Sequence, residues 1–177
     1  MLIIKMIIYI LIFLTTFLIG TLKSRKYKYR VEELKDFKTA LNIFKIKLKF
    51  TYEPLPEIFL EISEKLHTNM GKTFKIARIF MKEKSASLAW EEALDRDVLL
   101  NITKEDKSII KNLGNLLGET DIEGQINQID LTDSFINKQI SDAEKEKQKN
   151  EKLFRVLGAT IGFAIIIILM WWGKIWI

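Results

Sequence analysis

Two long apolar segments constrain this chain more than any other feature. Leu2 to Leu22 is 21 residues long and contains one charge, Lys5, while Val156 to Gly173 contains 18 residues and no charge. At ~1.5 Å per residue, each segment is roughly 27–31 Å long as a helix, which matches the hydrocarbon core of a bilayer. The sequence therefore predicts two transmembrane helices, at residues 1–22 and 156–177.

The first apolar segment is interpreted as an uncleaved span rather than a signal peptide. A cleaved signal peptide has its positive charge before the apolar core and small residues at a cleavage site after it. Here the larger charge cluster follows the core, and "IGTLKSRKYKYR" contains no site of the A-x-A type.

Basic residues flank both predicted spans on the side of the intervening loop. Residues 23–30, a basic juxtamembrane segment, carry Lys23, Arg25, Lys26, Lys28 and Arg30. Residues 144–155, a charged segment without an apolar stripe, are expected to form a helical stalk before the second span. The positive-inside rule then predicts that residues 23–155 are cytoplasmic and that both termini lie on the non-cytoplasmic side.

The second predicted span contains Gly158 and Gly162, four residues apart. Small residues at this spacing give a flat helix face on which another helix can approach closely. The partner is either the first span or another protein, and glycine is also common in membrane helices without such a role.

The region between the spans reads as helical throughout. Its apolar residues recur at steps of three and four, which is the period of one helix face. The first such stripe comprises Leu34, Phe37, Leu41, Phe44 and Leu48, and the last comprises Ile122, Ile126, Ile129, Asp133, Ile136, Ile140 and Ala143. Residues 31–143 are therefore expected to be an all-α, compact cytoplasmic bundle of about six helices.

Local signals divide this region into its helices. Pro54 ends one helix and Pro56 suits the first turn of the next. Asn69 and Gly71 are interpreted as stop residues of that second helix. Thr103 with Asp106, and Thr120 with Glu123, have the spacing of a capping box before an apolar run. No proline follows Asp121, so the last helix is expected to continue into the second span.

Composition excludes several classes of function. The chain has no cysteine and one histidine, His67, so neither a thiolate site nor a multi-histidine metal site is expected. Residues 31–152 hold 20 basic and 23 acidic residues, which argues against nucleic-acid binding. No phosphate-binding glycine loop, G-x-S-x-G or H-E-x-x-H motif occurs. We therefore expect no enzymatic activity and no cofactor.

The order of these parts, together with several sequence blocks, resembles the stage III sporulation protein AB family across nearly the whole chain. The blocks are "PLPEIF" (54–59), "SLAWEEAL" (87–94), "LGNLLGETDIEGQINQI" (113–129) and "EKQKNEKLFRVLGATIG" (146–162). Such proteins are similar to the cytoplasmic domains of type II secretion platform proteins. Those proteins carry two copies of the domain, whereas this chain carries one.

The resemblance implies a platform or adaptor in a secretion-like channel complex between mother cell and forespore. The implied partners are a cytosolic secretion-type ATPase, other membrane subunits of the channel and the lipid bilayer; because the chain carries one copy of the domain, a full platform would need homo-oligomers or other subunits. The implied location is the mother-cell membrane around the forespore. The alternative is a membrane-anchored lipid-binding module or membrane enzyme, using the basic segment and its tyrosines on anionic head groups.

Candidate partner contacts fall in two of the quoted blocks. They are Glu91, Glu92, Asp95 and Asp97 on one short acidic segment, and Gly114, Gly118, Asp121 and Gln125 around the following turn. Solvated acids on a helix face and an ordinary glycine helix stop remain the alternative interpretations.

Overall fold

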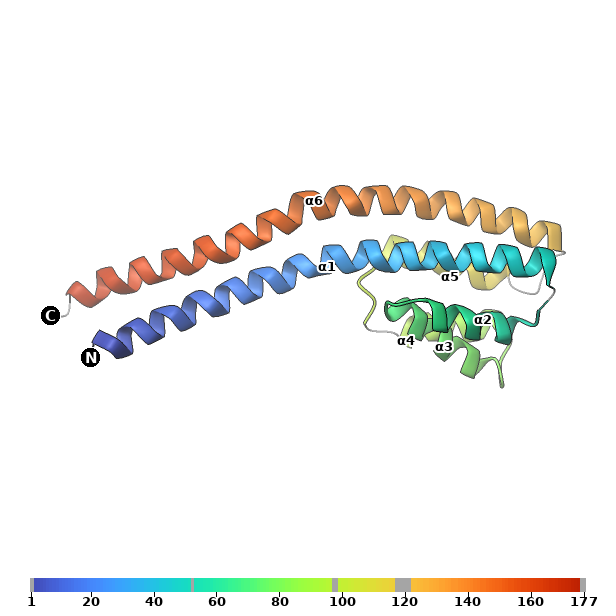
Figure 1. Cartoon of the computed structure of the whole chain (residues 1–177), viewed down its shortest axis with the longest axis horizontal. Helices are drawn as coiled ribbons and strands as arrows, with labels where there is room; N and C mark the ends of the chain where they lie inside the picture. Colours follow the sequence, from blue (N-terminus) through green and yellow to red (C-terminus); the bar gives the residue numbers. More distant parts are fainter. Residues whose placement is uncertain (1, 52, 97–98, 117–121, 176–177) are drawn as a thin grey trace. The chain divides into compact units, whose positions relative to one another are not determined.

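The chain is described by a computed structural model covering residues 2–51, 53–96, 99–116 and 122–175. Within these residues it is all-α, without a strand, which confirms the expected fold class. The six helices are α1 (Leu2–Phe50), α2 (Leu55–Lys65), α3 (Asn69–Phe80), α4 (Ala86–Arg96), α5 (Lys104–Leu116) and α6 (Ile122–Ile175) (Figure 1).

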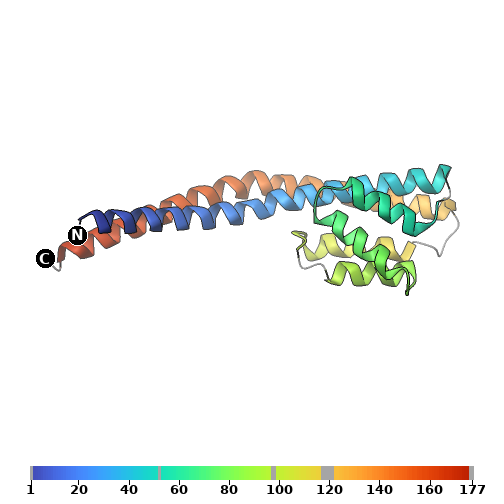
Figure 2. The ribbon, with the colours of Figure 1, turned by 60° about the horizontal axis from the view of Figure 1, so that its bottom comes forward.

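The chain divides into two compact units. The bundle unit spans Tyr29–Ala143, and the terminal unit combines Met1–Lys28 with Glu144–Ile177. Helices α1 and α6 each contribute a segment to both units. In the bundle unit, α2 to α5 lie beside the bundle segments of α1 and α6 (Figures 1 and 2).

Five aromatic side chains form the centre of the bundle core. Phe37, Phe44, Phe59, Phe74 and Trp90 have no exposed surface and come from α1, α2, α3 and α4. The Phe74 and Trp90 ring centroids are 4.6 Å apart, and Phe59 meets Trp90 edge to face at 5.7 Å. The indole Nε1 of Trp90 donates a 2.9 Å hydrogen bond to the carbonyl of Ile110, which joins α4 to α5.

The bundle segments of α1 and α6 bury most of their expected stripes. On α6, Ile129, Ile136, Ile140 and Ala143 are buried as expected, whereas Ile122 is 41% exposed and Asp133 is only partly buried. The buried face of α6 also includes Thr132 and Gln139, which the apolar stripe does not contain. These two polar side chains can be buried because each one makes hydrogen bonds.

The boundary between α2 and α3 differs from the sequence interpretation. Asn69 and Gly71 lie in the first turn of α3 and not at the end of α2, which closes at Leu66. Thr68 caps α3 by accepting a hydrogen bond from the backbone N–H of Met70. A Cβ on Gly71 would come within 3.1–3.2 Å of Leu66 and Ser63 atoms, so this glycine permits a tight turn between the two helices.

The capping box at the start of α5 is confirmed. Thr103 N donates to the Asp106 carboxylate at 2.8 Å, and Asp106 N donates to Thr103 Oγ1 at 3.1 Å. These reciprocal bonds satisfy two backbone donors at the helix start.

In the terminal unit, both helices contain an 18-residue window that is apolar and long enough to cross a membrane. Only 6% of the window in α1 and 11% of that in α6 is buried, which distinguishes them from core helices of a soluble protein. The two helices meet where glycines face each other: a Cβ on Gly20 would lie 2.6 Å from the Phe154 carbonyl and 3.0 Å from Gly158 Cα. Backbone contact of this kind requires glycine on both sides.

Candidate functional site

A buried ion pair lies where α1, α5 and α6 meet in the bundle. Arg30 Nε donates to Asp106 Oδ2 at 2.7 Å, and Arg30 Nη2 donates to Asp106 Oδ1 at 3.0 Å. Asp106 has no exposed surface and Arg30 is 6% exposed. The Asp106 carboxylate accepts these two bonds from Arg30 and also the bond from the backbone N–H of Thr103. The same carboxylate therefore caps α5 and holds α1 against it.

Gln139 extends this pair to α6. Its Oε1 accepts a 3.2 Å hydrogen bond from Arg30 Nη2, and its Nε2 donates at 2.9 Å to Glu105 Oε1. A single amide thus connects the buried Arg30–Asp106 pair to an exposed carboxylate on the rim of α5. The buried charges are both paired and hydrogen-bonded, as burial requires.

Two acids of α1 hold neighbouring loops. Glu33, which is 1% exposed, accepts a 2.6 Å bond from the backbone N–H of Asn101 ahead of α5. Asp36 accepts bonds from the backbone N–H groups of His67 and Thr68 ahead of α3, at 3.2 and 2.9 Å. The polar side of α1 therefore fixes where α3 and α5 begin.

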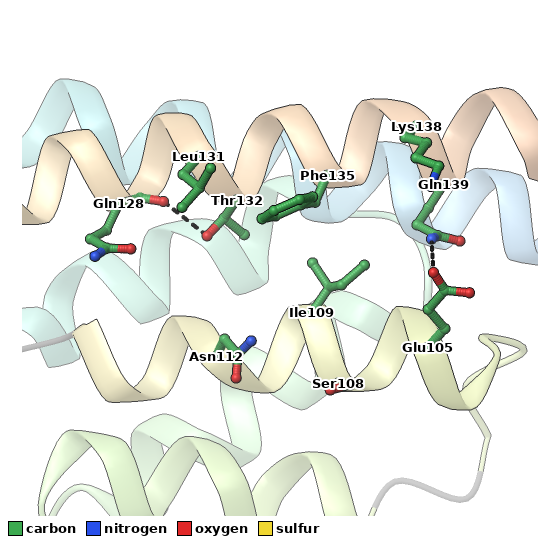
Figure 3. A pocket seen from close by; sticks show the side chains of 10 residues that line it. All are labelled: Glu105, Ser108, Ile109, Asn112, Gln128, Leu131, Thr132, Phe135, Lys138 and Gln139. Atoms are coloured by element: carbon green, nitrogen blue, oxygen red, sulfur yellow. Dashed lines mark hydrogen bonds between the residues drawn. The ribbon is translucent and has the colours of Figure 1, made fainter.

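An open groove of about 490 Å³ lies between α5 and α6, beside the buried ion pair. Figure 3 shows Ile109 on α5 pointing toward Phe135 on α6, with Leu131 one turn away on the same helix. Leu131 is 50% exposed and Phe135 is 49% exposed, so these large apolar side chains are only half covered by the bundle itself.

Polar groups surround this apolar strip. Ser108 and Asn112 lie along α5, Gln128 and Lys138 lie on α6, and the Glu105–Gln139 hydrogen bond closes one end (Figure 3). A half-exposed pair of large apolar residues with a polar rim is typical of a protein-binding surface. We call this surface the α5–α6 groove.

The acidic residues of α4 are brought together but are paired with bases. Lys111 contacts Glu91 at 2.5 Å, Lys107 contacts Asp95 at 3.0 Å, and Glu92 bonds both Lys84 and Arg96. The hydrogen bond from Lys84 lowers the pKa of Glu92, and that from Lys107 lowers the pKa of Asp95. The bond to Glu91 raises the pKa of Lys111. This face, with Leu88 at 57% exposure beside it, is balanced in charge.

Two further candidate partner contacts, Gly114 and Gln125, lie within the described residues and are buried. Gly114 is buried, and a Cβ there would lie 2.8 Å from Trp90 Cδ1, so the glycine makes room for the indole. Gln125 is buried on α6. The other candidates, together with the Thr120 cap, lie outside the described residues; they are Asp97, Gly118 and Asp121.

Gly158 and Gly162 lie against α1 within the terminal unit. A Cβ on Gly158 would be 2.9 Å from the Thr16 carbonyl, and one on Gly162 would be 2.5 Å from Thr16 Oγ1. The Phe13 and Phe163 rings, 4.9 Å apart, continue this contact along the helices. Of the two partners considered for the glycine pair, the first apolar helix occupies this face.

The sequence interpretation missed two features of the bundle. The sequence pattern places Arg30 among the basic juxtamembrane residues, whereas the structure shows a core residue whose partner is 76 positions away. Leu131 and Phe135 were missed because they fall outside the apolar stripe. Their spacing of four residues, off that stripe, was the available signal for a second contact face.

A family match, a characterised relative and a solved structure all relate this chain to the same kind of protein. The chain matches the family described as Stage III sporulation protein AB over residues 5–170. It is 26% identical over 151 residues to Stage III sporulation protein AB of Bacillus subtilis (strain 168), covering 83% of this chain and 88% of that protein. A solved structure of Stage III sporulation protein AB shares the fold, with a TM-score of 0.64 and 22% identity over 68% of this chain and 98% of that one. The chain therefore belongs to the stage III sporulation protein AB family.

Proposed function

We propose that this protein is a non-enzymatic membrane platform in a secretion-like channel complex between mother cell and forespore. The family supports a role in the sporulation SpoIIIA complex alongside other subunits, and it is a family of structural proteins not known as enzymes. Together with the two candidate spans, it supports association with a membrane. The platform role, the mother-cell location around the forespore and the partner ATPase are our proposal.

In this proposal α1 and α6 cross the membrane and the bundle unit faces the mother-cell cytosol. Lys23, Arg25 and Lys26 follow the apolar part of α1 and favour this orientation, because positive charge is retained on the cytoplasmic side. The matching run on α6 contains Lys145, Lys147, Lys149 and Lys152. Both termini then face the space between the two membranes.

The α5–α6 groove is the surface on which a cytosolic secretion-type ATPase docks. The observation that carries this assignment is the half exposure of Leu131 and Phe135 over a cavity of about 490 Å³. The acidic α4 face offers the weaker surface, since Glu91, Glu92 and Asp95 are already neutralised by lysines and arginine of the bundle. A partner would have to displace those bases before it could use the carboxylates.

Reconstitution with the ATPase tests the proposal. The full chain in lipid nanodiscs is mixed with the purified ATPase, and binding and ATP hydrolysis are measured. Phe135→Glu should abolish binding without unfolding the bundle, because the side chain is already half exposed and one polar group in a hot spot removes most of the affinity.

Leu88→Glu is the matched control, since Leu88 is 57% exposed on the α4 face. It should bind like the parent chain. Absence of binding by the parent chain would refute ATPase docking, and equal loss in both variants would refute the assignment of the groove.

A further inference from the structure

A crevice lies between α1 and α6 of the terminal unit, beside the contact of Gly20 with Gly158. It has a volume of about 250 Å³. Its walls are apolar except at one end, and the lining side chains are Thr16, Ile19 and Lys23 on α1 and Phe154, Leu157 and Ile161 on α6.

The crevice follows from the glycine contact. Without side chains at Gly20 and Gly158, the two backbones approach closely, so the flanking side chains cannot meet over the contact. Ile19, Leu157 and Ile161 are 57%, 42% and 51% exposed and stand along its rim. Their apolar surfaces remain available to a ligand that is itself apolar along its length.

Lys23 supplies the one charge of the crevice. Among the described residues it makes no hydrogen bond or ion pair, whereas Lys47 and Lys111 of the bundle are held by carboxylates. Lys23 lies at the end of the crevice nearest the basic segment that also contains Arg25 and Lys26. An apolar crevice with a cation at one end is complementary to an anionic phospholipid. The phosphate of such a lipid lies at the interface and its acyl chains lie in the hydrocarbon core.

We propose that this crevice binds an anionic phospholipid, with the phosphate on Lys23 and one acyl chain along Ile19, Leu157 and Ile161. The assignment rests on the proposed function to the extent that α1 and α6 cross a bilayer. It adds a specific ligand and a binding site to that proposal.

The dimensions and lining favour a lipid over other occupants. One turn of a transmembrane helix, roughly 10–12 Å across and ~5.4 Å long, fills on the order of 500 Å³, which is more than the crevice of about 250 Å³ can hold. A free phosphate ion would use Lys23 but make no contact with the apolar walls. A phospholipid contacts both parts, because its chain covers the walls while its phosphate meets the ammonium group.

Native mass spectrometry of the full chain in an uncharged detergent tests the proposal. Dioleoyl phosphatidylglycerol and dioleoyl phosphatidylcholine are titrated separately. Phosphatidylglycerol should bind more tightly, and Lys23→Gln should weaken it about fivefold, the change expected for loss of one cation near the membrane surface, while leaving phosphatidylcholine unchanged.

Lys26→Gln is the matched control, because Lys26 belongs to the same basic segment but does not line the crevice. Its effect should stay below twofold. Ile161→Trp, and independently Ile19→Trp from the opposite wall, should weaken both lipids by filling the crevice. Equal effects of Lys23→Gln and Lys26→Gln would overturn the proposal in favour of diffuse electrostatic attraction.

Three further outcomes would overturn the inference. Tryptophan variants that keep lipid affinity but change the oligomeric state would make the crevice a helix-docking face. Competition by inorganic phosphate would make it an ion site. Flotation of the chain with vesicles, without any preference for phosphatidylglycerol, would refute the lipid site alone; failure to float would refute the membrane platform as well.

Discussion

Arg30 and Asp106 lie 76 residues apart in the sequence and form a two-bond ion pair, 2.7 and 3.0 Å long, inside the bundle. The same carboxylate caps α5, and the same guanidinium reaches Gln139 on α6. One pair therefore fixes how three helices meet next to the α5–α6 groove. A docking surface made from α5 and α6 keeps its shape only while these helices keep their register.

Replacing one partner of this pair should strongly destabilise the bundle. Arg30→Met leaves Asp106 buried without its counter-charge, which typically costs about 3–5 kcal/mol. Lys45→Met is the control, because the Lys45–Asp130 pair is 39% and 50% exposed and should contribute about 0–1 kcal/mol. The free energy of unfolding of both variants is measured by denaturant titration, with Trp90 as the one remaining tryptophan. Similar losses of stability in Arg30→Met and Lys45→Met would contradict the role of the buried pair.

Gly114→Ala should destabilise the bundle although alanine favours helices. The new Cβ would lie 2.8 Å from Trp90 Cδ1 and 3.3 Å from the Ser87 carbonyl. Overpacking of this kind costs about 1–3 kcal/mol, which exceeds the helix-propensity gain of about 1 kcal/mol. Trp90 fluorescence should change as well. Asn112→Ala, at an exposed position of the same helix, should not destabilise it, and a more stable Gly114→Ala chain would disprove the tight contact.

The ion pairs made by the α4 carboxylates should give the bundle a stability plateau in pH. The pKa values of Glu92 and Asp95 are lowered below 4.5 and 3.8, so their contribution is complete above those values and is lost as the pH falls through the folded-state pKa. The pKa of Lys111 is raised above 10.5, so its contribution is complete below 10.5 and is lost on further rise. Unfolding midpoints measured against pH should fall at both ends.

Glu92→Gln should reduce the fall of the unfolding midpoint at acid pH and leave its fall at alkaline pH unchanged. Added salt should flatten the plateau, since these side chains are exposed and their pairs are screened. A midpoint that rises on acidification through pH 4 would contradict the assigned direction of the shifts.

Gly158→Leu should separate α1 from α6 in the terminal unit. The added side chain would begin 2.9 Å from the Thr16 carbonyl, a backbone atom that cannot move aside alone. Because the chain has no cysteine, Phe13→Cys with Phe163→Cys gives a clean cross-linking pair at a site where the rings are 4.9 Å apart. Cross-linking should drop in Gly158→Leu but persist in Thr160→Leu, where the parent side chain is exposed; persistence in both would refute the contact.

Periodicity predicted most of the bundle, because local apolar spacing largely determines which helix face is buried. Leu34, Phe37, Leu41 and Phe44 have no exposed surface, as their stripe predicted. On α6 the stripe correctly predicted the burial of Ile129, Ile136 and Ile140, but an apolar search assigns the buried Gln139 to solvent. Its burial depends on Arg30 and Glu105, which belong to distant parts of the sequence, so no local pattern reveals it.

The candidate site residues also depend on contacts between helices that are distant in the sequence. The α4 acids were recognised as a cluster, but their neutralisation by Lys107 and Lys111 depends on how α4 packs on α5. Gly114 was chosen from a sequence block, and its reason, the indole of Trp90, became visible only in the packed core. Contacts between helices, rather than signals within them, account for these differences.

Single-cysteine labelling tests whether one chain presents a cytosolic bundle from two membrane spans. Glu83→Cys places a thiol on the exposed segment after α3, and a second chain carries one cysteine added after Ile177. Both are expressed in non-sporulating cells, so that the protein inserts into the cell membrane, and spheroplasts of these cells are treated with a membrane-impermeant maleimide before and after lysis. We expect immediate labelling of the terminal cysteine and labelling of Glu83→Cys only after lysis. Labelling of Glu83→Cys in intact spheroplasts would contradict a cytosolic bundle.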